Sequence, residues 1–337
     1  MSRVLLLFGG RSAEHEVSCV SAVAIYDALV AADHQVIPVG IDRDGAWFVV
    51  DPSSRPFQAK GRPVWMRVPE GALIVSSDEV EFDVVFPVLH GPFGEDGTVQ
   101  GMFDIVGKPY VGCGVLSSAI AMDKDVARQL MQRAGLPTPR WELVRSGDYT
   151  DDPGGTVDAI TTSLGRTVFV KPAALGSSVG VSKATTAAEV KDALDEAFRY
   201  GEKAIVDEFI DGREIEVAIL EGAGAAIPGE VHPGNEWYDY EAKYHDESSR
   251  FEVPAPLSQP RTAEVQALAK RAFSTLECRG LARVDFLFEE AGRGFLINEV
   301  NTMPGFTPIS GYPKMWMASG MTYAELCNQL VELGLRD

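Results

Sequence analysis

Residues 281–313, LARVDFLFEEAGRGFLINEVNTMPGFTPISGYP, decide the fold of the C-terminal part of this chain. Two apolar runs, 284–288 and 294–300, flank the turn-forming EEAGRG, and this pattern predicts a β-hairpin. We place the centre of the turn near Gly292. The antiparallel pairs that follow are Asp285–Glu299, Leu287–Ile297 and Arg283–Asn301.

One face of this hairpin carries oxygen-bearing side chains beside Arg283, because side chains two apart on a strand share a face. They are Asp285, Glu299 and Asn301. Converging oxygen donors of this kind suit Mg²⁺, which phosphates and waters can complete to six ligands. The alternative is a solvated strand face with a salt bridge to Arg283. The segment that follows, NTMPGFTP (301–308), favours a site, because it predicts a loop held at a strand end.

Composition bounds the class of protein. A chain of 337 residues suits two or three domains, and 45% hydrophobic with 23% charged residues is typical of a soluble globular protein. The net charge of −19 argues against nucleic acid or an anionic membrane as a partner. It does not argue against ATP, because a few local basic residues can hold phosphates.

The cysteines and the N-terminus indicate a cytoplasmic protein. Four scattered cysteines without a CxxC pair predict buried free thiols in a reducing compartment. The first residues, MSRVLLLFGG, contain an apolar run too short for a signal peptide, so we expect a first β-strand there. No apolar run approaches the length of a membrane span.

The N-terminal part repeats a strand that runs into a glycine loop. The strand 4–8 leads into Gly-Gly and a helix, a unit that favours ligands at the carboxyl end of the strand. Glu14 lies where that loop meets the helix; it is either a site residue or a first-turn residue stabilised by the helix dipole. The second example, FDVVFPVLHGPFGEDG (82–97), places His90 at a strand end, where a site histidine is a reasonable candidate.

The middle of the chain offers two lysines and a glycine-serine loop. Residues 117–134 predict one helix, stopped by GLPTP, with Lys124 near its start as a solvated charge or a ligand. Lys171 ends a strand and precedes AALGSSVGVSK (173–183), whose small residues would let backbone N–H groups approach phosphate oxygens. This loop is no Walker A motif, and a plain hairpin tip is the alternative.

The last third combines a long loop with two helices. Residues 229–257 are polar and aromatic without periodicity, which predicts an ordered loop of the kind that forms lids. Residues 262–276 show helical spacing of apolar side chains, and TYAE (322–325) is a capping box that begins a final amphipathic helix.

Five motifs together resemble the D-alanine–D-alanine ligases of the ATP-grasp group. They are LARVDF, LINEVNTMPGFTPIS, HGPFGEDG, YEAKY and GGRSAEHEVS. The resemblance implies an ATP-grasp fold of the α/β and α+β classes, with an N-terminal open α/β (pre-ATP-grasp) domain over 1–120. A central subdomain (121–212) and a C-terminal subdomain (213–337), with the lid 229–257, would enclose ATP.

The resemblance also implies roles for individual residues. Phosphates would meet Lys124 and Lys171, the adenine Glu208 and the ribose Glu214. The D-alanine pocket would include His90 and Lys243, and the metal ligands for Mg²⁺ or Mn²⁺, with two ions expected, would be Asp285, Glu299 and Asn301. The catalytic group would be Glu14, Ser177, Tyr244, Arg283, Gly305 and Ser310.

Within this catalytic group, Arg283 and the backbone N–H near Gly305 would hold an oxyanion, and Ser310 the carboxylate of the second amino acid. Tyr244, linked to Ser177 and Glu14, is the candidate base.

The expected reaction is phosphoryl transfer from ATP to D-alanine, attack by the amine of a second D-alanine, and release of a dipeptide for peptidoglycan precursors. A homodimer is expected. Ligation to D-lactate or D-serine is the main alternative: Tyr244 favours an amine nucleophile, whereas His245 and Gly311 (a position where a larger apolar residue is expected) leave the alternative open.

Two further alternatives come from other ATP-grasp proteins. A relative that binds nucleotide without turnover should lack one of the three hairpin ligands, and this chain keeps them all. For a biotin-carboxylase-like enzyme the chain is short and lacks the carrier lysine region.

Overall fold

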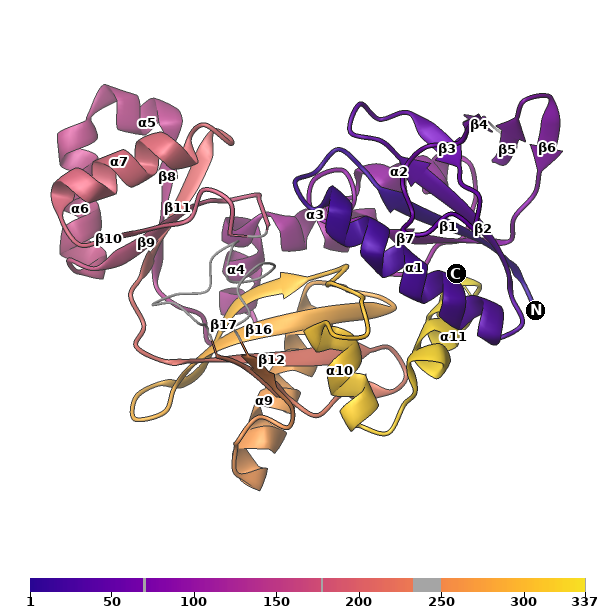
Figure 1. Cartoon of the computed structure of the whole chain (residues 1–337). Helices are drawn as coiled ribbons and strands as arrows, with labels where there is room; N and C mark the ends of the chain where they lie inside the picture. Colours follow the sequence, from indigo (N-terminus) through magenta and orange to yellow (C-terminus); the bar gives the residue numbers. More distant parts are fainter. Residues whose placement is uncertain (69–70, 177, 233–249, 337) are drawn as a thin grey trace.

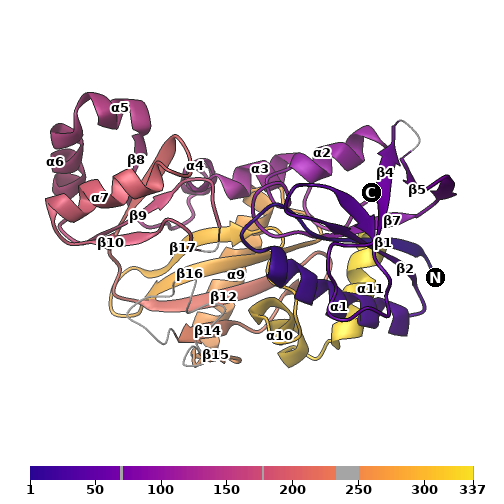
Figure 2. The same ribbon diagram turned by 45° about the horizontal axis from the view of Figure 1, so that its top comes forward.

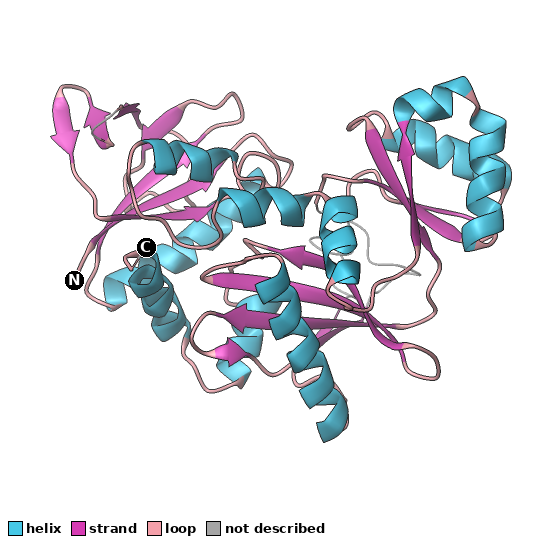
Figure 3. Ribbon diagram, turned by 180° about the vertical axis from the view of Figure 1, so that it is seen from behind, coloured by secondary structure: helices cyan, strands magenta, loops and turns pink. Residues whose placement is uncertain are grey.

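The computed structural model describes residues 1–68, 71–176, 178–232 and 250–336. These residues form three β-sheets with helices packed against them. The sheet built from the C-terminal part lies between the other two in all three ribbon views (Figures 1, 2 and 3).

The first sheet is built around β1 (Arg3–Gly9), which pairs in parallel with β2 (Gln35–Ile41) and β7 (Val84–Val88). The sheet continues beyond β2 with β3 (Trp47–Val49), β4 (Arg62–Arg67), β5 (Ala72–Val75) and β6 (Asp78–Val80). The segment 51–80 supplies β4 to β6. Because β1 and β7 are neighbouring parallel strands, the loops that follow them lie at the same edge of the sheet.

Helices cover both faces of this first sheet, which explains why β1 is apolar and buried from Val4 to Phe8. Alternate residues of β1 face opposite sides. Val4, Leu6 and Phe8 pack in the core that includes α1 (His15–Ala31) and α11 (Tyr323–Gly334), and Leu5 and Leu7 pack in the core of α2 (Thr98–Ile105). The C-terminal helix therefore packs against the N-terminal sheet, where it lies beside α1 (Figure 1).

The second sheet is antiparallel and has helices on one face (Figure 1). Its strands, in spatial order, are β10 (Ser182–Ala184), β9 (Val168–Pro172), β11 (Lys203–Glu208) and β8 (Trp141–Arg145). Its helices are α5 (Ser146–Asp151), α6 (Pro153–Leu164) and α7 (Ala187–Ala197). The apolar residues of these elements form a core of their own.

The third sheet contains the predicted hairpin. Its spatial order is β15 (Arg250–Glu252), β14 (Gly229–His232), β12 (Arg213–Leu220), β16 (Leu281–Glu289) and β17 (Gly294–Asn301), with β13 (Gly224–Ala225) beside β12. Helix α9 (Gln259–Thr275) packs on one face (Figure 3). The even-numbered residues Ala282, Val284 and Phe286 of β16 are buried on that face, which leaves Arg283 and Asp285 on the other.

The predicted register of the hairpin is confirmed at its open end and wrong nearer the turn. Arg283 pairs with Asn301 and Asp285 with Glu299, but Leu287 pairs with Leu296 instead of Ile297. A β-bulge causes this shift, because Asn298 is an extra residue on β17. Without it, Ile297 would share a face with Glu299; the bulge turns Ile297 into the core and leaves Glu299 in the cleft.

The single helix predicted over 117–134 is two helices, α3 (Val115–Met122) and α4 (Lys124–Arg133). Asp123 separates them because its backbone is extended and its side chain accepts a hydrogen bond from the N–H of Val126, which makes it the N-cap of α4. The predicted stop after α4 is confirmed, with Gly135 in the left-handed region at φ 68°.

Several smaller predictions also have an outcome. The capping box at Thr322 and Glu325 is confirmed, and the four cysteines are free and buried. The expected loop 229–257 is in part strand, since β14 and β15 lie at its two ends. Helix α10 (Gly311–Ala318) completes the fold. No helix in the described ranges has the length and apolar character needed to cross a membrane. The division at residues 120 and 212 stays a prediction.

Candidate functional site

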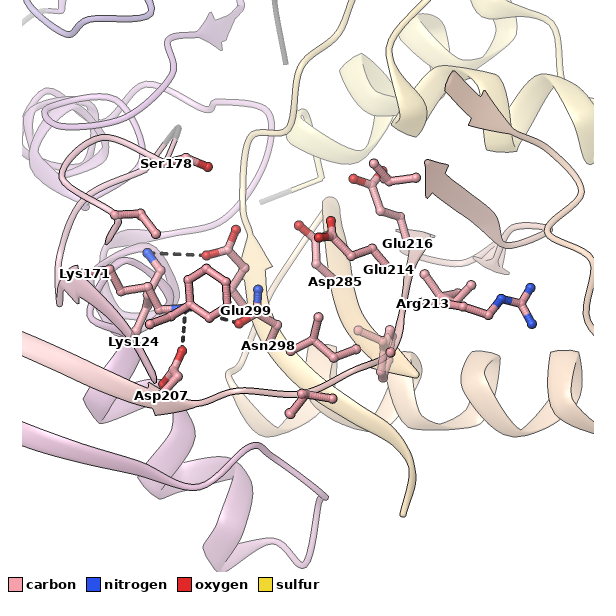
Figure 4. Close-up of a pocket in the computed structure, with 18 of the residues that line it drawn as sticks. Lys124, Lys171, Ser178, Asp207, Arg213, Glu214, Glu216, Asp285, Asn298 and Glu299 are labelled. Carbon is pink, nitrogen blue, oxygen red and sulfur yellow. Dashed lines mark hydrogen bonds and ion pairs between the residues drawn. The ribbon is translucent and has the colours of Figure 1, made fainter. Parts of the chain in front are cut away.

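A cavity of about 430 Å³ lies between the second and third sheets. Strands β9 and β11 form one wall and β12, β16 and β17 the other (Figure 4). Seven of the predicted site residues line it: Lys124, Lys171, Glu208, Glu214, Arg283, Asp285 and Glu299.

The two lysines reach the cavity from different elements and meet different partners (Figure 4). Lys171, near the end of β9, places Nζ 2.7 Å from Asp207 Oδ2 and donates a hydrogen bond of 3.3 Å to Asn298 Oδ1. Lys124, the first residue of α4, donates to the carbonyl oxygen of Leu175 at 2.7 Å and lies 3.4 Å from Glu299 Oε2. Burial lowers the pKa of Lys171, and the charge of Asp207 opposes that effect. Lys124 thus joins the glycine-serine loop to the hairpin.

A fully buried arginine binds two of the residues that hold Lys171. Arg128 on α4 forms a two-pronged ion pair with Asp207 and donates to both the carbonyl and the side-chain oxygen of Asn298. Burial opposes ionisation of Asp207, but the charges of Arg128 and Lys171 outweigh it and lower its pKa to about 2. The bulge residue Asn298 is therefore held by both cations.

The hairpin face is built around Asp285. Arg283 donates two hydrogen bonds of 2.7 Å to its two carboxylate oxygens, and Asn301 Nδ2 donates a third of 2.8 Å. Arg283 Nε also lies 3.4 Å from Glu216 Oε2. Burial opposes the charge of Arg283, yet Asp285 and Glu216 raise its pKa. The salt bridge considered as the alternative is thus present, but its side chains are only 16% and 15% exposed, so this is a cleft wall and not a solvated strand face.

The predicted metal ligands fit a hard divalent cation by their chemistry. Asp285 and Glu299 pair across β16 and β17, and Asn301 adds an amide oxygen, while phosphate oxygens would supply further ligands. Among the described residues no group of three or more His, Cys, Asp or Glu side chains is placed to hold a metal ion.

Another part of the cavity lining combines a buried carboxylate with two aromatic rings. The rings of Phe169 and Phe209 stack with centroids 6.2 Å apart, and both line the cavity. Glu208 is 6% exposed and accepts hydrogen bonds from the N–H and Nε of Arg140 and from Nη1 of Arg293. Burial opposes its charge, but these donors lower its pKa.

Glu14 and His90 lie in the loops that follow β1 and β7 of the first sheet. A Cβ atom on Gly91 would lie 3.0 Å from Glu14 Oε2, and one on Gly176 would lie 3.7 Å away, so Glu14 lies between the two loops. His90 is buried, and its Nδ1 contacts the carbonyl oxygen of Met303 at 2.9 Å. Burial lowers the pKa of His90, against the charge of Glu14, and therefore favours the neutral ring.

The loop after β17 brings Gly305 and Ser310 together. A Cβ atom on Gly305 would lie 3.3 Å from Ser310 Oγ, which accepts a hydrogen bond of 3.1 Å from the N–H of Thr307. The structure explains why a glycine occupies position 311. A Cβ atom there would lie 2.5 Å from Glu216 Oε2 and 2.9 Å from the Phe251 ring. The space expected for a larger apolar residue is thus filled by Phe251.

Three predicted residues, Ser177, Lys243 and Tyr244, lie outside the described residues, so the predicted contacts among Glu14, Ser177 and Tyr244 stay predictions. The roles of the other site residues also stay predictions. Neither Glu14, His90, Asn301, Gly305 nor Ser310 lines the cavity between the second and third sheets.

Sequence reasoning missed four residues of this region: Glu95, Arg128, Asp207 and Asn298. Two had a usable signal, since Glu95 belongs to the quoted HGPFGEDG motif and Asp207 precedes Glu208 at a strand end. Asn298 lies beside Glu299, but the bulge that turns it into the cleft has no local signature. Arg128 looks like an ordinary helix arginine.

Comparisons with known proteins show which family the chain matches. Residues 3–113 match the family model "D-ala D-ala ligase N-terminus" and residues 130–332 match "D-ala D-ala ligase C-terminus". The D-alanine--D-alanine ligase of Heliobacterium modesticaldum is 45% identical over 98% of this chain and 94% of its own length. That of Clostridium novyi is 42% identical over 99% of this chain and 98% of its own length.

Solved structures lead to the same family. The D-alanine-D-alanine ligase from Coxiella burnetii has a TM-score of 0.86 at 34% identity and covers 100% of this chain and 96% of its own. VanG D-Ala:D-Ser ligase from Enterococcus faecalis has a TM-score of 0.87 at 32% identity, with coverage of 98% and 99%. The resemblance and the predicted ATP-grasp fold are therefore confirmed. The chain belongs to the D-alanine–D-alanine ligase family of ATP-grasp enzymes.

Proposed function

We propose that this protein is an ATP-dependent ligase that joins two D-alanine molecules into D-alanyl-D-alanine for peptidoglycan precursors. The observation that carries the proposal is the cavity between the second and third sheets, where two lysines face a hairpin of carboxylates. In phosphoryl transfer the protein mainly positions cations and metal-binding carboxylates, and the substrate supplies the nucleophile. The lysines and carboxylates of this cleft suit that role. The full-length similarity to ligases of this name supports it.

ATP would lie along the cavity with its phosphates at Lys124 and Lys171. Its base would lie near the rings of Phe169 and Phe209, which line the cavity. Glu208 would lie near the base and Glu214 near the ribose, away from the phosphate charge. Lys171 is bound to Asp207 and Asn298 and Lys124 to Leu175, so both ammonium groups are held in place before ATP arrives. Preorganised charge of this kind stabilises a phosphoryl-transfer transition state without reorganisation.

Asp285, Glu299 and Asn301 would hold Mg²⁺ or Mn²⁺, with two ions expected, and the metal would supply charge neutralisation for the phosphates when bound. Arg283 is fixed to Asp285 by two hydrogen bonds and stays charged in the cleft, so it suits the developing oxyanion together with the N–H near Gly305. Glu14 and His90 would contact the first D-alanine, and Ser310 the carboxylate of the second.

The reaction follows from these positions. The carboxylate of the first D-alanine attacks the γ-phosphorus of ATP and gives an acyl phosphate and ADP. The neutral amine of the second D-alanine attacks the acyl carbon, the C–O bond to phosphate breaks, and the amine proton leaves with a base. Tyr244, with Ser177 and Glu14, is the candidate for that base.

The proposal is tested by phosphate release from ATP with D-alanine as the only amino acid. We expect release that depends on D-alanine, stops when divalent cations are chelated, and yields D-alanyl-D-alanine by mass spectrometry. Glu299→Gln should lower kcat on the order of 10²-fold or more, because it removes a carboxylate charge from the metal set. Glu332→Gln, an exposed change of the same type on α11, serves as the control and should match the wild type. Phosphate release without D-alanine dependence would refute the function.

The D-serine alternative has one supporting observation, the likeness to VanG, and the same assay decides it. Equal concentrations of D-alanine, D-serine and D-lactate should give D-alanyl-D-alanine as the main product near neutral pH. A mixed product with D-serine or D-lactate in excess would favour the alternative.

We also propose a homodimer in the cytoplasm, without nucleic acid or membrane as a partner. The net charge of −19 supports the last point, because both partners demand a basic surface. Light scattering at several protein concentrations tests the dimer.

A further inference from the structure

One residue of the loop after β17, Met303, is held at both of its backbone polar groups by the loop that follows β7. The N–H of Met303 donates to Glu95 Oε2 at 3.2 Å, and its carbonyl oxygen lies 2.9 Å from Nδ1 of His90. Because a carbonyl can only accept, Nδ1 of His90 carries the proton. These contacts join residues more than 200 positions apart in the sequence.

The loop that makes these contacts is braced by hydrogen bonds of its own. Glu95 Oε1 accepts from the N–H of Gly91 at 2.7 Å, and the N–H of Glu95 donates to the carbonyl of Gly91 at 2.9 Å. Asp96 accepts from the N–H groups of Phe93 and Thr98 at 2.8 and 2.9 Å. The carboxyl group of Glu95 thus bridges a braced loop on one side and Met303 on the other.

Met303 lies between two groups of predicted site residues. Asn301 precedes it by two positions, and Gly305 follows it by two. Beyond Gly305, the carbonyl of Phe306 accepts a hydrogen bond of 2.6 Å from the hydroxyl of Tyr323. The segment 302–306 is therefore fixed at one end by the loop after β7 and at the other by α11.

We propose that His90 and Glu95 form a two-point clamp on Met303, and that Glu95 is a positioning residue which sets the place of Gly305 and Ser310 for the second substrate. This inference rests on the proposed ligase function for its kinetic part. Glu95 acts through Met303, and nothing in the inference requires it to touch a substrate. Small displacements of a binding group can cost about 10²-fold in rate, so a contact of this kind matters even at a distance from the reacting atoms.

The test uses three variants of the whole protein. Glu95→Ala removes both acceptors, whereas Glu95→Gln keeps the length of the side chain and one acceptor oxygen. Asp96→Ala is the control, because it weakens the same loop but makes none of the contacts to Met303. Each variant is measured by amide hydrogen exchange over residues 301–310 and by steady-state kinetics with D-alanine and with ATP as the varied substrate.

We expect Glu95→Ala to speed exchange over 301–310 and to lower kcat/KM for D-alanine roughly 10- to 100-fold, with KM for ATP changed less than about twofold. Glu95→Gln should lower kcat/KM for D-alanine less than Glu95→Ala does. Asp96→Ala should keep the wild-type exchange over 301–310. Unchanged exchange in Glu95→Ala overturns the clamp, and faster exchange with unchanged kcat/KM for D-alanine overturns the positioning role. A wild type without D-alanine-dependent turnover would refute the proposed function, and the positioning role with it, while the exchange data would still decide the clamp.

Discussion

Asp207 shows how a single carboxylate balances the charges in the cleft. It lies between the fully buried Arg128 and the nearly buried Lys171, and both of its oxygens are used. Without it, two cations would face each other in a region of low dielectric. An unpaired buried charge costs far more than a surface ion pair contributes.

Asp207→Asn should therefore destabilise the protein by about 3–5 kcal/mol, because it leaves Arg128 without its counter-charge. The control is Asp27→Asn, which removes an ion pair with Arg55 whose side chains are 62% and 35% exposed, and it should cost about 0–1 kcal/mol. Urea unfolding of the two variants and the wild type measures both values. Equal losses in the two variants would contradict the charge balance that we infer.

The same residue gives a pH dependence with a defined sign. The folded pKa of Asp207 is about 2, below its ordinary value of 3.8, so its stabilisation is present above about pH 4 and lost as the pH falls towards 2. The shift corresponds to about 2 kcal/mol. The unfolding free energy of Asp207→Asn should consequently fall less steeply below pH 4 than that of the wild type.

At the scale of elements, the break between α3 and α4 positions Lys124. Asp123 caps α4 and also binds Lys203 of β11 at 2.6 Å, so it links the start of that helix to the second sheet. The N–H of Lys124 in turn donates to the carbonyl of Ala173 at 2.9 Å. A continuous helix would lose all of these contacts.

We expect Asp123→Ala to cost about 1 kcal/mol as a lost N-cap and, in addition, to raise KM for ATP several-fold, because it frees the first turn that carries Lys124. Asp152→Ala is the matched control: Asp152 caps α6 by accepting from Gly155 at 2.9 Å, on the helical face of the second sheet. It should lose similar stability without a change in KM. Thermal unfolding and ATP titrations of initial rate measure the two effects, and a rise in KM in both variants would assign the effect to stability alone.

The elements also show how far the sequence predicts this molecule. The hairpin, the capping box and the stop at Gly135 follow from local rules, because apolar alternation, caps and glycine at positive φ act within a few residues. The bulge at Asn298 does not, because it is stabilised by Lys171, far away in the sequence. The break at Asp123 combines a local N-cap, which the helical pattern over 117–134 conceals, with a distant partner, Lys203. Among the predicted residues that line the cavity, the hairpin pattern identified Arg283, Asp285 and Glu299, and the motif resemblance identified Glu208 and Glu214. Neither gave a reason to single out Arg128.

At the scale of the whole molecule, one hydrophobic core combines elements from the two ends of the sequence. The core below β1 contains side chains of α11, including Leu330, so the first and last elements of the described chain share it. The second sheet has a separate core, to which Leu194 of α7 belongs. Residues that share a packed core unfold together, whereas separate cores can open separately.

A pair of matched substitutions tests this division. Leu330 and Leu194 are both 0% exposed, and a buried leucine changed to alanine costs about 2–5 kcal/mol. We expect Leu330→Ala to speed hydrogen exchange in β1, β7 and α11 together and to leave β9 and β11 protected. Leu194→Ala should do the reverse, with faster exchange in the second sheet and an unchanged first sheet. If either variant speeds exchange equally in all three sheets, the chain unfolds as one unit and the second sheet has no independent stability. Because Lys171 lies on the second sheet and Asp285 on the third, independent opening of the second sheet would also open the cavity between these two sheets without disturbing the core that α11 shares with β1.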